Sequence, residues 1–166
     1  QKAEDIAKRL EDLADKQEKL SEETKEGKTD QEELKKEQEK LNKEMEELRK
    51  QMDELEKKNS ELEEPMDIPK TDEKEQGIQD EQKKSSEELE KKQNQKAGDS
   101  QKKAAEEMDQ LAFEMKSAME SSAEEQQEED MDALRQLLEN IVQLSFDQEG
   151  VMEDLSTTTT KDPRFI

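Results

Sequence analysis

Residues 31–62, QEELKKEQEKLNKEMEELRKQMDELEKKNSEL, contain the most regular hydrophobic pattern in the chain. A leucine recurs there every seven residues, and methionine or a polar residue lies between successive leucines. On a helix these positions form one narrow stripe, which suits knobs-into-holes packing against another helix. The predicted helix-packing seam consists of seven apolar residues: Leu34, Leu41, Met45, Leu48, Met52, Leu55 and Leu62.

Two polar residues, Gln38 and Asn59, fall on the same stripe. A buried polar residue can fix the register or the number of partner helices. In a short, imperfect seam it can equally well be solvated, and the pattern leaves both interpretations open.

Composition restricts the chain to two structural classes. The formal net charge is -22, 47% of the residues are charged and only 26% are hydrophobic, which is too little apolar material for an ordinary globular core. The remaining classes are long amphipathic helices and disorder. Abundant Glu, Lys, Gln, Leu, Met and Ala, with few Gly and Pro, favour helices.

An earlier helix is predicted upstream of the seam. Apolar and small residues recur there in steps of three and four between Ala3 and Thr24. Gly27 is a helix stop signal, and Thr29 with Glu32 has the spacing of a capping box that starts the next helix. Residues 1–64 are therefore predicted to form a helical arm with a break near Gly27, either a bent rod or a hairpin, with the hairpin favoured.

The remaining boundaries follow from prolines and from a change of period. The prolines in residues 65–72 predict a turn. Residues 73–120 follow an eleven-residue pattern, which predicts a nearly straight return helix that Gly98 could interrupt. An acidic linker and an amphipathic helix are predicted for residues 121–155, the linker being either a loop or an exposed helical stretch, and an extended tail is predicted for residues 156–166.

The amphipathic helix within residues 130–155 has the most apolar sequence in the chain. Its apolar face is wider than a two-stranded seam needs, so we expect it either to complete a bundle or to bind a partner. The candidate partner-binding residues are Leu134, Leu137, Leu138, Ile141, Val142, Leu144 and Phe146.

The sequence carries none of the usual motifs of catalysis. It has no histidine and no cysteine, and its four glycines are isolated, so general-base, thiolate and phosphate-loop motifs are missing. We expect no enzyme activity, no cofactor and no metal ion; the acidic cluster in residues 124–132 is interpreted as a solvated helix face. The excess of acidic residues also argues against binding nucleic acid or anionic lipid directly.

Three segments resemble a bacterial family of very large, membrane-anchored coiled-coil proteins of unknown function. They are KEQEKLNKEMEELRKQMDELEKKNSELEEPMDI, SSEELEKKQNQKAGDSQKKAAEEM and MDALRQLLENIVQLSFDQEGVMEDL, with ELEEPMD and LSFDQE as the distinctive pieces. The resemblance implies a parent protein with membrane-spanning helices elsewhere and a periplasmic location for this segment. It implies no catalytic residues.

The sequence as a whole predicts an all-α fold, either an antiparallel coiled-coil helical hairpin or a small elongated helical bundle with a partly irregular C-terminal tail. The functional hypothesis is a non-catalytic scaffolding segment of a larger cell-envelope protein that binds or spaces protein partners. Its alternatives are a holdase-like chaperone arm and a coiled-coil arm of a larger ATPase. The sequence indicates neither the partner nor the oligomeric state.

Overall fold

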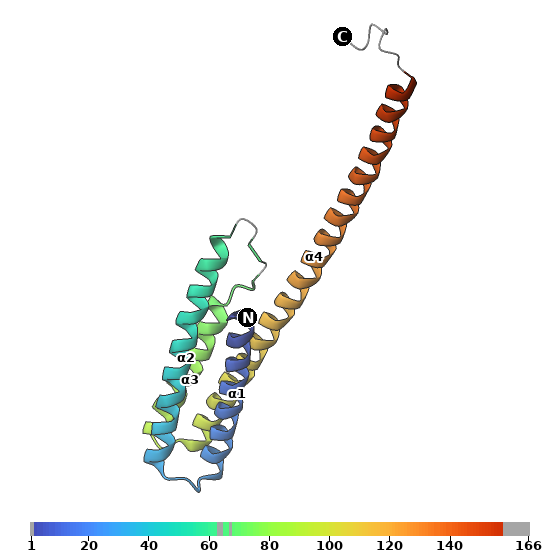
Figure 1. The fold of residues 1–166 in the computed structure, drawn as a ribbon. Coiled ribbons are helices and arrows are strands. Elements are labelled where there is room, and N and C mark those ends of the chain that lie inside the picture. Colours follow the sequence, from blue (N-terminus) through green and yellow to red (C-terminus); the bar gives the residue numbers. More distant parts are fainter. Residues whose placement is uncertain (1, 63–64, 67, 158–166) are drawn as a thin grey trace. The chain divides into compact units, whose positions relative to one another are not determined.

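The computed structural model describes residues 2–62, 65–66 and 68–157, and this part of the chain is all-α, as predicted. Four helices and no strand are present in the described residues (Figure 1): α1 Lys2–Glu26, α2 Gln31–Ser60, α3 Asp72–Glu90 and α4 Asn94–Thr157. The chain divides into unit 1, Gln1–Ser122, and unit 2, Ala123–Ile166. Helix α4 contributes its first part to unit 1 and the remainder to unit 2.

Unit 1 is an antiparallel four-helix bundle. Side-chain bonds link the neighbouring helices, and along each pair the residue numbers rise on one helix as they fall on the other. The bonds that show this are Arg9–Gln51 and Lys16–Glu44 between α1 and α2, Asn42–Ser86 and Arg49–Gln79 between α2 and α3, Lys74–Glu114 and Glu88–Ser100 between α3 and α4, and Glu11–Lys116 and Lys25–Asp99 between α1 and α4. Helices α1 and α2 therefore form a hairpin at Gly27 and not a bent rod, and the fold is the small helical bundle and not a single helical hairpin.

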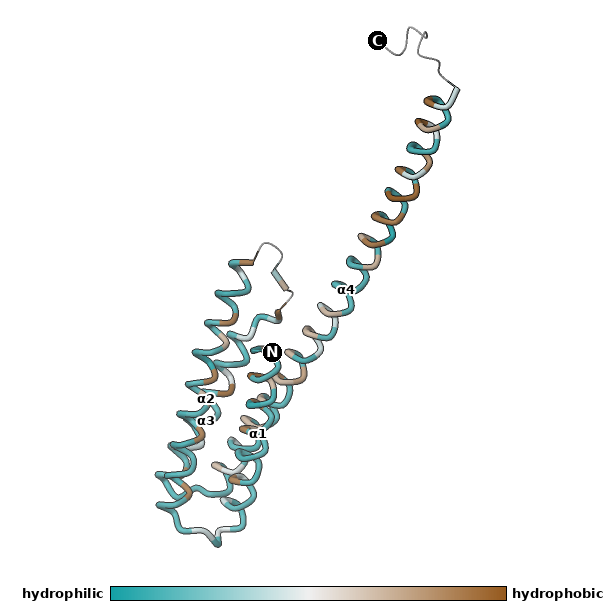
Figure 2. The backbone as a smooth tube through the Cα atoms, viewed as in Figure 1, coloured by the Kyte–Doolittle hydropathy of each residue, from teal (hydrophilic) through white to brown (hydrophobic). Residues whose placement is uncertain are grey.

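The core of unit 1 is drawn from all four helices. Leu10, Leu48, Ile78 and Met108, one from each helix, are at most 2% exposed. In each helix of unit 1, apolar residues are spaced among a majority of hydrophilic ones (Figure 2). Sparse apolar residues suffice here since each helix buries only one stripe.

The turn between α1 and α2 begins at Gly27, which has a φ of 64°. Glycine adopts this left-handed conformation without the steric cost that a side chain brings. The predicted capping box was wrong in its register: Asp30, not Thr29, is the N-cap, and its carboxylate accepts a hydrogen bond from the Glu32 backbone N–H at 2.9 Å.

Helix α2 ends at Ser60, earlier than the predicted arm of residues 1–64. The Asn59 side chain accepts from the Met66 backbone N–H at 2.9 Å and donates to the Met66 carbonyl at 2.7 Å, which turns the chain out of the helix. Leu62 consequently lies beyond α2 and is 52% exposed. Its assignment to the packing seam is corrected: heptad spacing continues in the sequence after the helix has stopped.

The predicted return helix over residues 73–120 was also wrong, because α3 ends at Glu90 and α4 begins at Asn94. Lys92 adopts a left-handed φ of 59° between them. The Gln93 N–H donates to the Glu88 carbonyl at 2.8 Å, and the Lys92 N–H to the Leu89 carbonyl at 3.0 Å. These bonds satisfy carbonyls at the end of α3 in the manner of a Schellman turn. Gly98, the expected interruption, lies inside α4.

We expect Lys92→Gly to stabilise unit 1 by about 0.5–1 kcal/mol, because glycine relieves the cost of a left-handed side-chain-bearing residue. The measurement is the urea unfolding midpoint of the whole chain, followed by circular dichroism. Lys91→Gly is the matched control, since Lys91 has an ordinary φ of −80°. A gain in Lys91→Gly equal to that in Lys92→Gly would contradict the conformational explanation.

Candidate interaction face

The predicted packing seam of α2 lies inside unit 1. Leu34, Leu41, Met45, Leu48 and Met52 are buried, and Leu55 packs partly buried against the same core. These side chains contact the other helices of the bundle. They are therefore occupied by the fold itself and do not form a surface for a partner.

A layer of buried glutamines crosses the middle of unit 1. Each helix contributes one glutamine with at most 2% exposure, and α3 adds a buried serine: Gln17, Gln38, Gln82, Ser85 and Gln101. The heptad spacing placed Gln38 on the seam of α2. No pattern marked Gln101, which lies next to Ser100 on the buried face of α4.

Gln38 is the centre of this glutamine layer. Its carbonyl oxygen Oε1 accepts from Gln17 at 2.9 Å, from Ser85 at 2.9 Å and from Gln101 at 2.9 Å. Its amide Nε2 donates back to Gln17 at 3.1 Å and to Asn42 at 2.8 Å. The register interpretation of Gln38 thus has a geometric basis, because its partners meet only when the helices keep this alignment.

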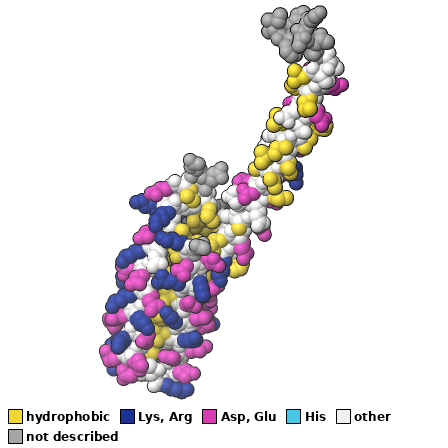
Figure 3. All heavy atoms as spheres, in the orientation of Figure 1, with side chains coloured by type: hydrophobic (Ala, Val, Ile, Leu, Met, Phe, Trp, Pro, Cys, Tyr) yellow, Lys and Arg dark blue, Asp and Glu magenta, His cyan; other side chains and the backbone are white. Residues whose placement is uncertain are grey.

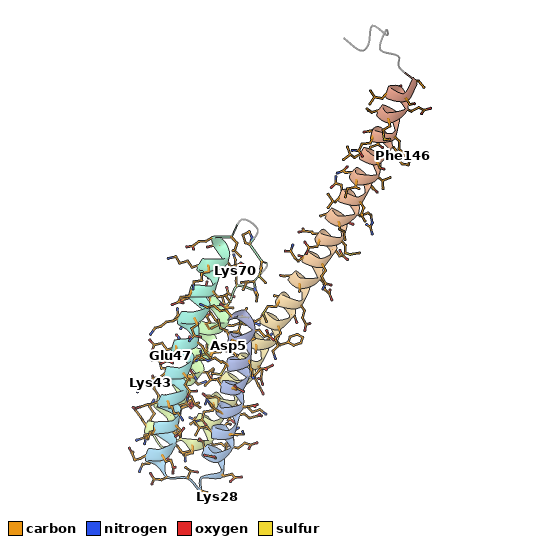
Figure 4. All side chains as sticks on the ribbon, viewed as in Figure 1. Asp5, Lys28, Lys43, Glu47, Lys70 and Phe146 are labelled. Carbon is orange, nitrogen blue, oxygen red and sulfur yellow. The ribbon has the colours of Figure 1, made fainter. Side chains whose placement is uncertain are left out.

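Unit 2 holds the other predicted set, the candidate partner-binding residues. All seven lie on α4, and the exposed fractions of their side chains range from 53% for Leu134 and Val142 to 63% for Phe146. Met131, Val151, Met152 and Leu155 extend the same exposed set. The space-filling view shows hydrophobic side chains along this part of the chain (Figure 3), and the Phe146 side chain projects from the helix (Figure 4).

Eight of these eleven side chains form two adjacent rows along α4, and the other three, Met131, Val142 and Phe146, lie to one side of the rows. Leu134, Leu138 and Ile141 follow one another in steps of four and three, and Met152 and Leu155 continue the same row. A second apolar row, formed by Leu137, Leu144 and Val151, lies beside it. We call residues 131–155 with these rows the apolar face; it is roughly 37 Å long at about 1.5 Å per residue. Two adjacent rows give a surface wide enough to contact more than one helix.

Of the two alternatives for residues 121–130, the exposed helical stretch is correct, and these residues belong to α4. Its acidic residues are exposed, as a solvated helix face requires. Arg135 pairs with Asp132 at 2.7 Å, both side chains being well exposed. An exposed pair of this kind contributes little to stability.

Another group of carboxylates lies in unit 1. Oxygens of Asp53, Asp72 and Glu75 lie within 4.8 Å of one another. Glu75 is buried, and Arg49 Nε lies 3.4 Å from its Oε2. The guanidinium already supplies positive charge to this group. Burial raises the pKa of Glu75 above its ordinary value, and the neighbouring Asp53 carboxylate adds to the rise while Arg49 opposes it.

Glu75→Gln is expected to stabilise unit 1 at about pH 7, because the raised pKa means that the fold favours the neutral side chain. A carboxyl whose folded pKa exceeds its unfolded pKa gains stability as the pH falls through the folded value, and the gain is complete below the unfolded value. The wild-type unfolding midpoint should therefore rise as the pH falls from neutral, and it should rise less in Glu75→Gln. The exposed neighbour Glu73 provides the control substitution, Glu73→Gln, which should leave the pH response unchanged. An unchanged response in Glu75→Gln would show that other groups produce it.

Comparison of the chain with protein-family models, with curated proteins and with solved structures gives no match. None of the helices in the described residues combines the length and the apolar character that a membrane crossing requires.

Proposed function

We propose that the chain is a non-catalytic scaffolding segment that binds a protein partner through the apolar face of α4. The observation that carries this proposal is the exposure of eleven large apolar side chains over 25 residues, Met131 to Leu155, each more than half exposed. Contiguous apolar surface is costly in water, and on soluble proteins it commonly marks a site of association.

The two units have different roles in this proposal. Unit 1 buries its apolar stripes internally and presents a surface of alternating acidic and basic side chains (Figure 3). It acts as a folded spacer with coiled-coil-like packing. Unit 2 supplies the surface that binds the partner, because a single helix cannot cover its own apolar rows.

The cellular setting forms part of the proposal. The resemblance to the membrane-anchored coiled-coil family suggests a cell-envelope parent, with this segment on its periplasmic side. The acidic surface fits a segment that stays off anionic lipid headgroups, since like charges repel at such a surface.

A photo-crosslinking amino acid placed on the apolar face of the intact parent protein, in its own cells, tests the proposal. Leu138 is the test position and Gln143, on the opposite side of α4, is the matched control. We expect one crosslinked species of discrete mass from Leu138, none from Gln143, and loss of the product when Ile141 is replaced by Gln. The absence of a product at Leu138 would reject the interaction face. A broad mixture of clients from Leu138 would reject the scaffold in favour of a holdase.

A further inference from the structure

The charge of unit 2 distinguishes it from unit 1. Residues 1–122 contain 38 acidic and 25 basic residues, so acidic side chains there have basic neighbours on adjacent helices. Residues 123–157 contain eleven acidic residues and one basic residue, Arg135. That basic residue is paired with Asp132. Residues 123–157 therefore combine an apolar face with a formal charge of −10.

Acidic residues border the apolar face on both sides. Counting 100° per residue, Glu149, Glu153 and Glu139 fall on the side of the two rows where Val142 and Phe146 lie. Asp147 falls beside the opposite edge, next to Leu144 and Val151. A helix that covers the apolar rows would thus bring the residues on its own borders close to these carboxylates. The charges of those residues would then determine which helix binds.

A second copy of this chain is a poor occupant. Pairing two apolar faces would bring two surfaces of charge −10 together, with carboxylates along both borders of each face. Like charges across an association surface oppose it, and the repulsion is only screened at high salt. An uncharged or acidic helix would cover the apolar rows but bring no basic side chain to these carboxylates.

On these grounds we infer that the partner of unit 2 is a basic amphipathic helical segment, with apolar residues against the two rows and Lys or Arg along its borders. This inference rests on the proposed function, because it specifies the partner of the same face. Complementary charge would also accelerate encounter and select this partner from other amphipathic helices.

Two model peptides test the inference against the whole chain. Both have about 25 residues and identical leucine rows, and their flanking positions are Lys in one and Glu in the other. At about 50 mM salt we expect the Lys peptide to bind at least about tenfold more tightly than the Glu peptide, measured by fluorescence anisotropy. At about 500 mM salt the difference should shrink to about threefold or less.

Variants of the chain locate the effect. The triple substitution Glu139→Gln, Glu149→Gln and Glu153→Gln should weaken binding of the Lys peptide about fivefold or more. The matched control, Glu47→Gln, Glu54→Gln and Glu56→Gln, removes the same three charges from exposed positions of unit 1 and should leave binding within about twofold. Leu138→Gln with Ile141→Gln should remove binding of both peptides.

The outcomes separate this inference from the proposed function. Equal affinity for the Lys and Glu peptides, or an equal loss in the two triple variants, overturns the basic-partner inference and leaves the crosslinking result unaffected. Failure of the Lys peptide to bind also overturns it. Dimerisation of the chain alone at about pH 7, or binding to phosphatidylcholine vesicles in preference to the Lys peptide, would replace the inferred partner with a second copy or a lipid surface.

Discussion

Leu48→Ala is expected to lower the stability of unit 1 by about 2–5 kcal/mol, because it removes a side chain that is 2% exposed from the centre of α2 and leaves a cavity. A fold of this size has a total stability of about 5–15 kcal/mol, so the loss is a large fraction of the whole. The measurement is urea unfolding of the full chain followed by circular dichroism, with the change read from the midpoint.

Leu62→Ala is the matched control for this prediction. Leu48 and Leu62 occupy equivalent heptad positions, two repeats apart, yet Leu62 is 52% exposed and lies beyond the end of α2. We expect Leu62→Ala to change stability by no more than about 0.5 kcal/mol. Equal losses in the two variants would show that the seam continues through Leu62 and that α2 ends later than Ser60.

The second large effect is expected in the glutamine layer. Gln38→Leu should destabilise unit 1 by about 3 kcal/mol, since it removes the acceptor of Gln17, Ser85 and Gln101 and leaves these buried groups without a partner. Gln76→Leu, at an exposed position of α3, is the control and should stay within about 0.5 kcal/mol.

Replacing the whole layer should have the opposite effect on stability. With Gln17, Gln38, Gln82 and Gln101 changed to Leu and Ser85 changed to Ala, no polar side chain of the layer remains, and the free energy of unfolding should return to the wild-type value or exceed it. We expect this variant to lose the single register of its helices, because leucines pack in several registers whereas the hydrogen bonds between these glutamines form in only one. Amide hydrogen exchange and sedimentation would then show a less uniform bundle or a mixture of oligomers. A combined variant less stable than Gln38→Leu, or one as uniformly protected as the wild type, would contradict this account of the layer.

Much of the fold could be predicted from local patterns. The heptads of α2, the glycine at the first turn and the prolines before α3 each act within a few residues, so their consequences for helix formation are visible in the sequence. The exposed face of α4 could likewise be described in advance, because the spacing of its apolar residues depends only on helical period.

The errors occurred where nonlocal packing competes with local preference. The turn at Lys92 contains neither Gly nor Pro, and it forms because folding α4 back buries Ala97, Ala104 and Met108 against the bundle. The seam was extended to Leu62 since a heptad pattern does not show where the chain leaves the helix. Gln101 was overlooked because a glutamine on an acidic, polar helix gives no sign of burial until three other helices surround it.

The sequence by itself determined that this chain forms helices with narrow apolar stripes, and that its C-terminal helix carries more apolar surface than it can bury alone. Both properties depend on residue type and helical period. Only the tertiary structure decided which stripes meet, where α3 turns into α4, and that four glutamines share one layer. These outcomes depend on contacts between residues distant in the sequence, whose free energy is realised only once all four helices have assembled.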